Sequence, residues 1–377
     1  MNSSLTLQHK SLNLFRYPKA LQHKSLQAWD AADEYLIEYI SDNIPPDRLA
    51  NMLIFNDDFG ALTCWFQSYQ PHWYGDSFVS RLACQMNLRD NGLNWDDNHF
   101  HDALSRPLAA EVIVLKIPKS QALLEQQLID LQSVVTRQTQ IIAAGKTNSI
   151  SKATLGLFEK YLGTTTTSLA RKKARLIFCS ASADKQHSSP YPTVWTMTDS
   201  GFTISNHANV FSRQSIDIGG RFMLENLPDC SGKTVVDLGC GNGILGLTVL
   251  ARYADAKVIF IDESAMAIAS AQQNVQTNLA DSIERAQFLL SNCLEQLTPQ
   301  TIDVVLCNPP FHQQNTITDH IAWQMFNDSK QRLVRGGELR VVGNRHLDYP
   351  RKLKKLFGGY QVVASNQKFS ILSCIKR

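Results

Sequence analysis

Thr234-Val-Val-Asp-Leu-Gly-Cys-Gly-Asn-Gly243 is a short apolar run that ends in a carboxylate and three glycines. An apolar run of this length is typical of a strand that is buried on both faces of a parallel sheet. Glycines after such a strand let the backbone turn sharply and approach a ligand closely, at the sheet edge where open α/β proteins bind ligands. We therefore expect an α/β fold in which a nucleotide-like cofactor contacts Asp237, Gly239, Cys240, Gly241 and Gly243.

A second strand of the same sheet is expected to end in acids. Lys257-Val-Ile-Phe-Ile-Asp262 is apolar up to its last residue. The carboxylate of Asp262 can accept hydrogen bonds from ribose hydroxyls, and we place its neighbour Glu263 in the same cofactor site. The glycine spacing also fits the Gly-x-Gly-x-x-Gly dinucleotide pattern, so these residues alone leave both a nicotinamide dinucleotide and S-adenosylmethionine open.

A third apolar strand ends in Asn308-Pro-Pro-Phe311 and removes that ambiguity. Hydride transfer does not require a proline-stiffened turn with two hydrogen-bond acceptors. Methylation of an exocyclic amine does require them, because acceptors on the two amine protons favour the pyramidal form that attacks. The Asn308 side-chain oxygen and the Pro309 backbone oxygen are two such acceptors, held without later reorganisation. Pro310 stiffens the turn, and Phe311 offers a ring face for stacking a base. We predict that these four residues form the catalytic site of an S-adenosylmethionine-dependent N-methyltransferase.

The first half of the chain repeats this plan with altered residues. Its counterparts of the three strands are residues 52–60, 73–76 and 111–118. Apolar strands separated by helical stretches predict two doubly wound α/β domains with parallel sheets. Residues 180–192, rich in Ser and Pro, are expected to link them, and we divide the chain into 1–185 and 186–377.

The composition indicates an ordinary folded protein with two locally basic segments. Hydrophobic residues make up 44% and charged residues 19% of the 377 positions, and no apolar run has the length of a membrane span, so we expect a soluble, cytoplasmic protein. The eight cysteines show no metal-binding spacing. Lys and Arg exceed Asp and Glu by 8 to 1 in residues 137–175 and by 12 to 2 in residues 330–377. Such blocks suggest surfaces for a polyanion, although solvated helix faces give the same counts.

Together the motifs resemble the class I S-adenosylmethionine-dependent methyltransferases that modify exocyclic or planar-amide nitrogens. The duplicated layout covers nearly the whole chain and is similar to that of the bacterial ribosomal RNA guanine-N2 methyltransferases. Residues 206–213, 305–314 and 344–349 are most similar to the RlmG-type enzymes, which act on large-subunit (23S) ribosomal RNA. The resemblance implies two tandem class I methyltransferase-like domains, the first degenerate and RNA-holding, the second catalytic. It implies S-adenosylmethionine as cofactor and 23S ribosomal RNA as partner, without a metal or a membrane, and leaves the target nucleotide and the oligomeric state open.

The first half itself indicates that its cofactor site is lost. Asn56-Asp-Asp-Phe-Gly60 stands where the second half has the glycine loop, and Lys116 stands where it has Asn308. Side chains in the loop obstruct a cofactor, and a lysine cannot accept an amine proton. We expect Lys116, Lys119 and the run 171–175 to contact phosphate instead, with a solvated surface as the alternative.

One residue departs from the family pattern, and several rival functions stay open. Many class I methyltransferases receive the adenine amine with an acid where this chain has Asn292, whose amide oxygen can still accept that hydrogen bond. Asp217 fits either a cover over the ligand or the first turn of a helix. The rivals are a small-subunit (16S, RsmC-type) guanine-N2 methyltransferase, a methyltransferase for adenine or protein glutamine, a nicotinamide-dependent dehydrogenase and a non-enzymatic RNA-binding protein.

Overall fold

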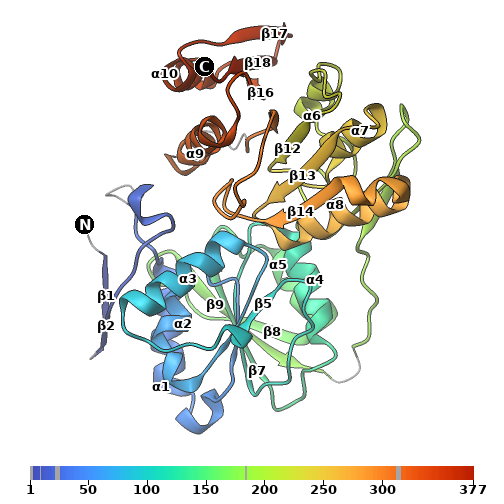
Figure 1. Ribbon diagram of the computed structural model, residues 1–377. Coiled ribbons are helices and arrows are strands. Elements are labelled where there is room, and N and C mark those ends of the chain that lie inside the picture. The colour runs from blue at the N-terminus through green and yellow to red at the C-terminus, as the bar shows by residue number, and fades with distance from the viewer. Residues whose placement is uncertain (1–2, 9, 22–25, 183–184, 311–315) are drawn as a thin grey trace. The chain divides into compact units, whose positions relative to one another are not determined.

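The chain folds into two α/β units, Met1–Pro190 and Tyr191–Arg377 (Figure 1). The computed structural model describes residues 3–8, 10–21, 26–182, 185–310 and 316–377. The division between the units and the predicted division at residue 185 both fall between β9 (Ala174–Ala181) and β10 (Thr193–Thr196). Each unit contains a two-stranded hairpin and a seven-stranded sheet.

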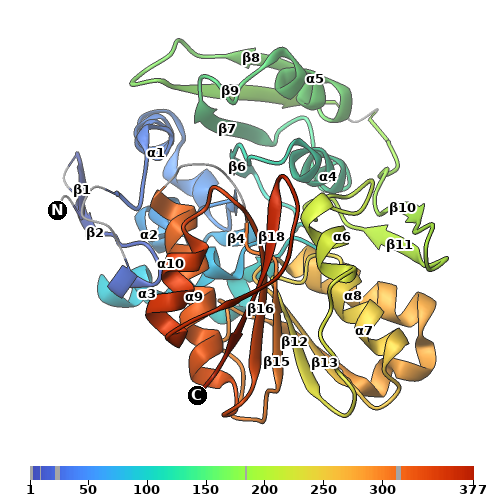
Figure 2. The ribbon, with the colours of Figure 1, turned by 90° about the horizontal axis from the view of Figure 1, so that it is seen from above.

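The second unit is a mixed sheet between two helical layers. Its strands are β10, β11 (Thr203–Asn206), β12 (Thr234–Leu238), β13 (Lys257–Asp262), β14 (Ala286–Leu290), β15 (Val304–Cys307), β16 (Glu338–Asn344), β17 (Gln361–Ser365) and β18 (Phe369–Ile375). Its helices are α6 (Ile218–Leu224), α7 (Ile244–Arg252), α8 (Ala265–Asn278), α9 (Thr316–Arg332) and α10 (Tyr349–Phe357). Figure 2 shows α9 and α10 on one face of the sheet and α6, α7 and α8 on the other. Because both faces are covered, most residues of the central strands are apolar and buried.

The first unit repeats the same architecture. Its strands are β1 (Ser4–Leu7), β2 (Lys10–Asn13), β3 (Leu53–Phe55), β4 (His72–Gly75), β5 (Phe100–Asp102), β6 (Val112–Lys116), β7 (Gln140–Lys146), β8 (Gly163–Thr167) and β9. Its helices are α1 (Ala31–Asn43), α2 (Ala61–Trp65), α3 (Phe78–Asp90), α4 (Gln121–Leu131) and α5 (Lys152–Tyr161). In the described part of the chain, no helix has both the length and the apolar composition needed to cross a membrane.

The two sheets have the same strand order, which confirms the predicted fold class and the internal repeat. The orders are β5-β4-β3-β6-β7-β9-β8 and β14-β13-β12-β15-β16-β18-β17. In both sheets the first five strands in space are parallel, the sixth (β9 or β18) is antiparallel to both of its neighbours, and the edge strand (β8 or β17) therefore runs in the direction of the first five. The carboxyl ends of the parallel strands therefore lie at equivalent places in the two units.

The register also aligns the two loops residue by residue. Phe55 pairs with Leu115 as Leu238 pairs with Cys307, so Lys116 and Asn308 follow equivalent strand positions. Gly60 and Gly243 both precede a helix in the left-handed region, with φ of +80° and +77°. A Cβ at Gly60 would lie 2.6 Å from Cys84 Sγ, and one at Gly243 would lie 2.8 Å from Ala271 Cβ, so both glycines are needed for close packing against the next helix.

A buried asparagine on the helix after the second strand holds each glycine-loop region. The Asn274 side chain donates to the carbonyl oxygen of Asn242 at 2.9 Å, and it both accepts from and donates to the backbone of Ser205 in the hairpin. Asn87 does the same with Phe59 and Phe15 in the first unit. The repeat therefore includes the segment before the core, and α3 and α8 brace equivalent loops.

Candidate functional site

The glycine loop after β12 combines one packing glycine with open space in front of another. Gly239 and Gly241 have φ of +72° and +54°, a region that favours glycine. A Cβ added at Gly241 would meet no atom within 4 Å, whereas Gly243 packs on α8. The loop thus keeps its backbone accessible at Gly241, as binding of a nucleotide-like ligand requires.

Asp237 is buried and anchors the helix that follows the loop. Its Oδ2 accepts a hydrogen bond from the Gly246 backbone N–H at 2.9 Å. Burial, which disfavours the charged form, raises the pKa of Asp237 to about 7. The Cys240 thiol is buried too, and burial raises its pKa, so this side chain is a neutral packing group beside the loop.

Asp262 ties the end of β13 to the glycine loop. Its Oδ2 accepts from the Gly241 backbone N–H at 2.9 Å, and its Oδ1 accepts from the Ser264 N–H at 3.0 Å. The next residue, Glu263, is exposed. The structure therefore brings together Asp262, Glu263 and Gly241, three of the residues predicted to contact the cofactor.

Asn292, beyond the end of β14, is buried and held by an acid that lies three residues later. Its Nδ2 donates to Glu295 Oε2 at 2.9 Å, and its backbone N–H donates to Gln296 Oε1 at 2.8 Å. Since the carboxylate only accepts hydrogen bonds, it fixes the amide with its nitrogen toward Glu295. The amide oxygen of Asn292 therefore faces away from Glu295 and can accept a hydrogen bond from another group.

Asn308 presents a buried amide oxygen at the same sheet edge. Its Nδ2 donates to Asp217 Oδ2 at 3.3 Å, and its Oδ1 is buried without a hydrogen-bond partner among the described residues. Asp217 also caps α6, because the same Oδ2 accepts from the Gly220 N–H at 3.0 Å. The helix-start interpretation of Asp217 is thus confirmed. An acceptor-only carboxylate turns the Asn308 nitrogen toward itself and leaves the oxygen for another donor.

Two prolines complete the described part of this corner. Pro309 is buried and Pro310 is exposed, shortly after the last paired residue of β15. Phe311, predicted to stack on the base, lies outside the described residues.

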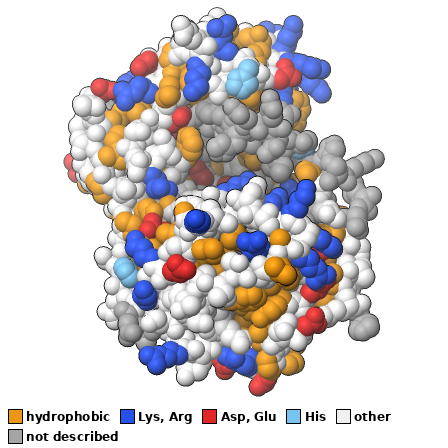
Figure 3. Space-filling view, turned by 180° about the vertical axis from the view of Figure 1, so that it is seen from behind, with side chains coloured by type: hydrophobic (Ala, Val, Ile, Leu, Met, Phe, Trp, Pro, Cys, Tyr) orange, Lys and Arg blue, Asp and Glu red, His pale blue; other side chains and the backbone are white. Residues whose placement is uncertain are grey.

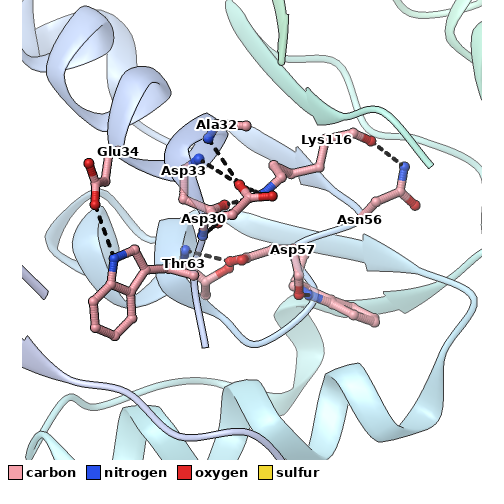
Figure 4. Close-up of polar contacts among 10 residues, drawn as sticks. Asp30, Ala32, Asp33, Glu34, Asn56, Asp57, Thr63 and Lys116 are labelled. Atoms are coloured by element: carbon pink, nitrogen blue, oxygen red, sulfur yellow. Dashed lines mark hydrogen bonds and ion pairs between the residues drawn. The ribbon is translucent and has the colours of Figure 1, made fainter. Parts of the chain in front are cut away.

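The equivalent corner of the first unit is filled by an ion pair (Figure 4). Lys116 Nζ donates to Asp33 Oδ1 at 2.6 Å and to Asp30 Oδ1 at 3.1 Å, and Asp30 caps α1 as Asp217 caps α6. Burial lowers the pKa of Lys116, but the carboxylates of Asp33 and Asp30 raise it more, so the lysine stays charged. Asn56 donates to the Lys116 backbone oxygen at 3.0 Å. This bond links the segment equivalent to the glycine loop with the residue equivalent to Asn308.

The expectation that Lys116 contacts phosphate is therefore wrong. Its side chain is buried and both of its ion-pair partners are supplied by α1 or its cap. The run 171–175 is also partly used within its own unit, since Arg171 pairs with Glu38 and Lys172 pairs with Glu34. Local sequence does not reveal these pairings, because the carboxylates lie more than eighty positions away from Lys116 in the chain.

The second basic segment is less neutralised. Among the described residues its ion pairs join Arg340 to Glu338 and Arg351 to Asp348, and the Arg351 side chain is 85% exposed. Lys354 and Lys355 are exposed on α10. Figure 3 shows one face of the molecule, with Lys and Arg side chains spread widely over it. Cationic surface thus exists despite the small net charge.

Sequence reasoning did not find the contact between Asp217 and Asn308. A signal for it was present, because an aspartate precedes the first core helix of each half, at Asp30 and Asp217, and a polar residue ends each equivalent strand. Only the fold shows that these positions meet.

Comparison with known proteins finds a family match for each half of the chain. Residues 2–183 match the family model described as "RLMG N-terminal domain", and residues 201–373 match the "Methyltransferase small domain". The chain is 56% identical to a "Ribosomal RNA large subunit methyltransferase G" of Pseudoalteromonas atlantica, with all of both chains covered. It is 50% identical to a protein of the same name from Klebsiella pneumoniae, with 99% of this chain and 98% of that protein covered.

A solved structure shares the whole architecture. It is the T. thermophilus 16S rRNA N2 G1207 methyltransferase (RsmC) in complex with AdoMet and guanosine, with a TM-score of 0.77, 20% identity, and coverage of 99% of this chain and 97% of that one. At this identity the likeness shows a common fold of two tandem units. The identities of about one half over the full length of the relatives are the stronger finding, and by them the chain belongs to the ribosomal RNA large subunit methyltransferase G family.

Proposed function

We propose that this protein transfers a methyl group from S-adenosylmethionine to the N2 amine of a guanine in large-subunit (23S) ribosomal RNA. The observation that carries the proposal is the buried Asn308 oxygen, which has no partner among the described residues and is oriented by Asp217. The names of the relatives support RNA of the large subunit over the 16S alternative. The family's methyltransferase domain favours this function over a dehydrogenase or a non-enzymatic RNA-binding protein.

The residues at the carboxyl ends of β12, β13 and β14 fit the cofactor. Open space in front of Gly241 leaves room for a close approach of a ligand, and a side chain there would fill it. We assign Asp237 to hold the loop, Asp262 and Glu263 to the ribose, the Asn292 oxygen to the adenine amine, and Gly239, Cys240 and Gly243 to the wall of the site. When bound, S-adenosylmethionine supplies an electrophilic methyl group on its sulfonium.

The protein contributes positioning of the attacking amine. The Asn308 oxygen and the Pro309 carbonyl accept the two amine protons, which turns the nitrogen lone pair toward the methyl group. Asp217 fixes the Asn308 amide before the base enters, so little reorganisation is needed during transfer. The amine proton passes to solvent water with or after methyl transfer. Phe311 is assigned to stack on the base.

The basic outer side of α10 is assigned to the RNA backbone. Lys and Arg contacts to phosphate supply affinity that does not depend on sequence. Because the first basic segment is partly paired with α1, we assign the first unit a supporting role in RNA binding and the second unit the main one. We place the activity in the cytoplasm, where ribosomes are assembled.

The deciding experiment compares ribosomal RNA from cells with and without this protein. We expect N2-methylguanosine to disappear from one position of the 23S RNA, and purified protein with labelled cofactor to restore it. Loss from 16S RNA would establish the small-subunit alternative, and no loss from either RNA would overturn the proposal.

Asn308→Ala tests the assigned chemistry. We expect transfer to fall by at least about 100-fold, because an acceptor is removed where charge develops, while calorimetry shows cofactor binding largely unchanged. Gln361→Ala, at an exposed site on the edge strand, is the matched control and should behave as wild type. Near-normal turnover of Asn308→Ala would contradict the role of Asn308, and binding of NAD in place of S-adenosylmethionine would favour the dehydrogenase.

A further inference from the structure

A second amide oxygen is buried without a partner at the end of the neighbouring strand. Asn344 closes β16, and its Oδ1 has no hydrogen-bond partner among the described residues. A buried acceptor that lacks a donor costs about 1–3 kcal/mol, so it calls for a physical explanation. A donor that arrives with a ligand is such an explanation.

Asn344 lies on the same side of the sheet as Asn308. Side chains alternate along a strand, so Asn344 shares a face with Val342, and Asn308 shares a face with Leu306. Val342 and Leu306 belong to one core cluster, together with Phe369, which pairs with Asn344. This face is the one covered by α6, which packs on β16 and β18 and begins directly after Asp217. Asn308 therefore lies at the start of α6, and Asn344 lies on a strand that α6 covers.

The strand register sets their separation. Cys307 is level with Val341, so Asn308 is level with Val342 and Asn344 lies two residues further along the adjacent strand. With about 3.3 Å per residue and about 4.8 Å between strands, the two Cα atoms are about 8 Å apart. Two amide side chains at this distance can converge on neighbouring atoms of one base edge.

We propose that Asn344 is a second contact of the target base and accepts the N1–H of guanine, while Asn308 and Pro309 accept the protons of its N2 amine. This inference rests on the proposed function. Guanine carries a donor at N1 beside the N2 amine, whereas 2,6-diaminopurine keeps the same amine but has an unprotonated acceptor at N1. The Asn344 oxygen therefore selects guanine by its N1–H.

The test uses two synthetic RNA fragments that span the methylated nucleotide, once it has been mapped, with guanine or 2,6-diaminopurine at that position. We expect the wild-type protein to prefer guanine by about tenfold or more in kcat/KM, the effect of one satisfied against one unsatisfied hydrogen bond. Asn344→Ala should lower the rate on guanine and leave the rate on diaminopurine nearly unchanged, so that the preference collapses. Asn344→Asp, which keeps an acceptor oxygen, should retain it.

The melting temperature separates base binding from a purely structural role. If Asn344 only recognises the base, Asn344→Ala removes an unpaired buried acceptor and should unfold at the same temperature as wild type or higher. If Asn344 is structural, the variant should unfold at a lower temperature. Equal use of both RNAs by the wild-type protein, or an unchanged preference in Asn344→Ala while Asn308→Ala is inactive, would overturn this inference alone. Failure of the wild-type protein to methylate guanine at all would instead overturn the proposed function.

Discussion

Asp217 and Asp30 occupy equivalent positions in the two units but contact different residues. Each aspartate caps the first core helix of its unit and contacts the residue that ends the equivalent strand. Where that residue is Asn308, the carboxylate orients an amide, and where it is Lys116, the carboxylate neutralises an ammonium group. The identity of the strand-end residue therefore decides whether the corner can accept protons from an amine.

Asp217→Ser separates capping from orientation. Serine is a good N-cap, so the start of α6 should be kept, but its shorter side chain should not reach Asn308. We expect kcat to fall by about 10–100-fold, the worth of a hydrogen bond to a charged group, with unchanged melting temperature and cofactor affinity. Asp217→Asn, which keeps an acceptor at the same reach, should recover most of the activity. Wild-type kcat in Asp217→Ser would refute the positioning role.

Asp237 makes the stability of the second unit depend on pH. Its pKa is raised from 3.8 to about 7 by burial, so the folded state holds a proton that the unfolded state releases above pH 4. The stability that this group contributes is present below about pH 4 and is lost as the pH rises through 7, by at most about 1.4 kcal/mol per pH unit. In Asp237→Asn the free energy of unfolding should therefore increase relative to wild type between pH 4 and pH 7. Urea denaturation across that range measures the difference. A constant difference in the free energy of unfolding between the two proteins from pH 4 to pH 7 would contradict the raised pKa of Asp237.

At the scale of elements, the loops depend on helices that are distant in sequence. Asn274 of α8 holds the carbonyl of Asn242 in the glycine loop and the backbone of the β10–β11 hairpin.

In α10 one side buries Tyr349, Leu353 and Phe357 in the core, which leaves the lysines between them on the outside. An amphipathic helix with a cationic outer side suits a phosphate backbone, because long lysine side chains need no fixed geometry to reach it.

The double variant Lys354→Glu and Lys355→Glu tests this element. We expect weaker binding of 23S RNA fragments and a shallower dependence of log affinity on log salt, by about 0.7–0.9 for each phosphate that is no longer neutralised. Titrations at several salt concentrations measure both quantities. The control is the double variant Lys233→Glu and Lys257→Glu, which makes the same charge change away from α10, at the amino ends of β12 and β13. Equal weakening in the two variants would indicate only a general charge effect and would contradict a specific surface on α10.

At the scale of the whole molecule, the chain is a duplicated fold whose copies have diverged at the site. Both sheets keep the same strand order and both loops keep the packing glycine, Gly60 or Gly243. The first copy has closed its corner with Lys116 between Asp30 and Asp33. The first copy thus holds a buried ion pair at the place where its counterpart has Asn308 with a buried, unpartnered amide oxygen.

Lys116→Met should destabilise the first unit without changing the chemistry. Removing one partner of a buried ion pair leaves uncompensated carboxylates and costs about 3–5 kcal/mol. Hydrogen exchange in mild denaturant should show faster opening in peptides from 26–182 than in those from 191–310, while kcat of the folded protein stays at its wild-type value. Lys119→Met, at an exposed site, is the control, and Lys116→Met combined with Asp33→Asn should recover part of the stability. Unchanged exchange in Lys116→Met would show that the pair adds little.

The sequence alone predicts the α/β architecture, the repeat, and the strands that lead to Asp262 and Asn308, because apolar runs and the glycines and prolines after them are local signals. It also indicated that the first copy had lost its site. Only the tertiary structure decided which side chains meet. The burial of Lys116 against Asp33, the orientation of Asn308 by Asp217, and the alignment of Asn344 with Asn308 depend on contacts between distant segments and on strand register. Such contacts follow from how the sheet and its helices pack, and no window of neighbouring residues contains them.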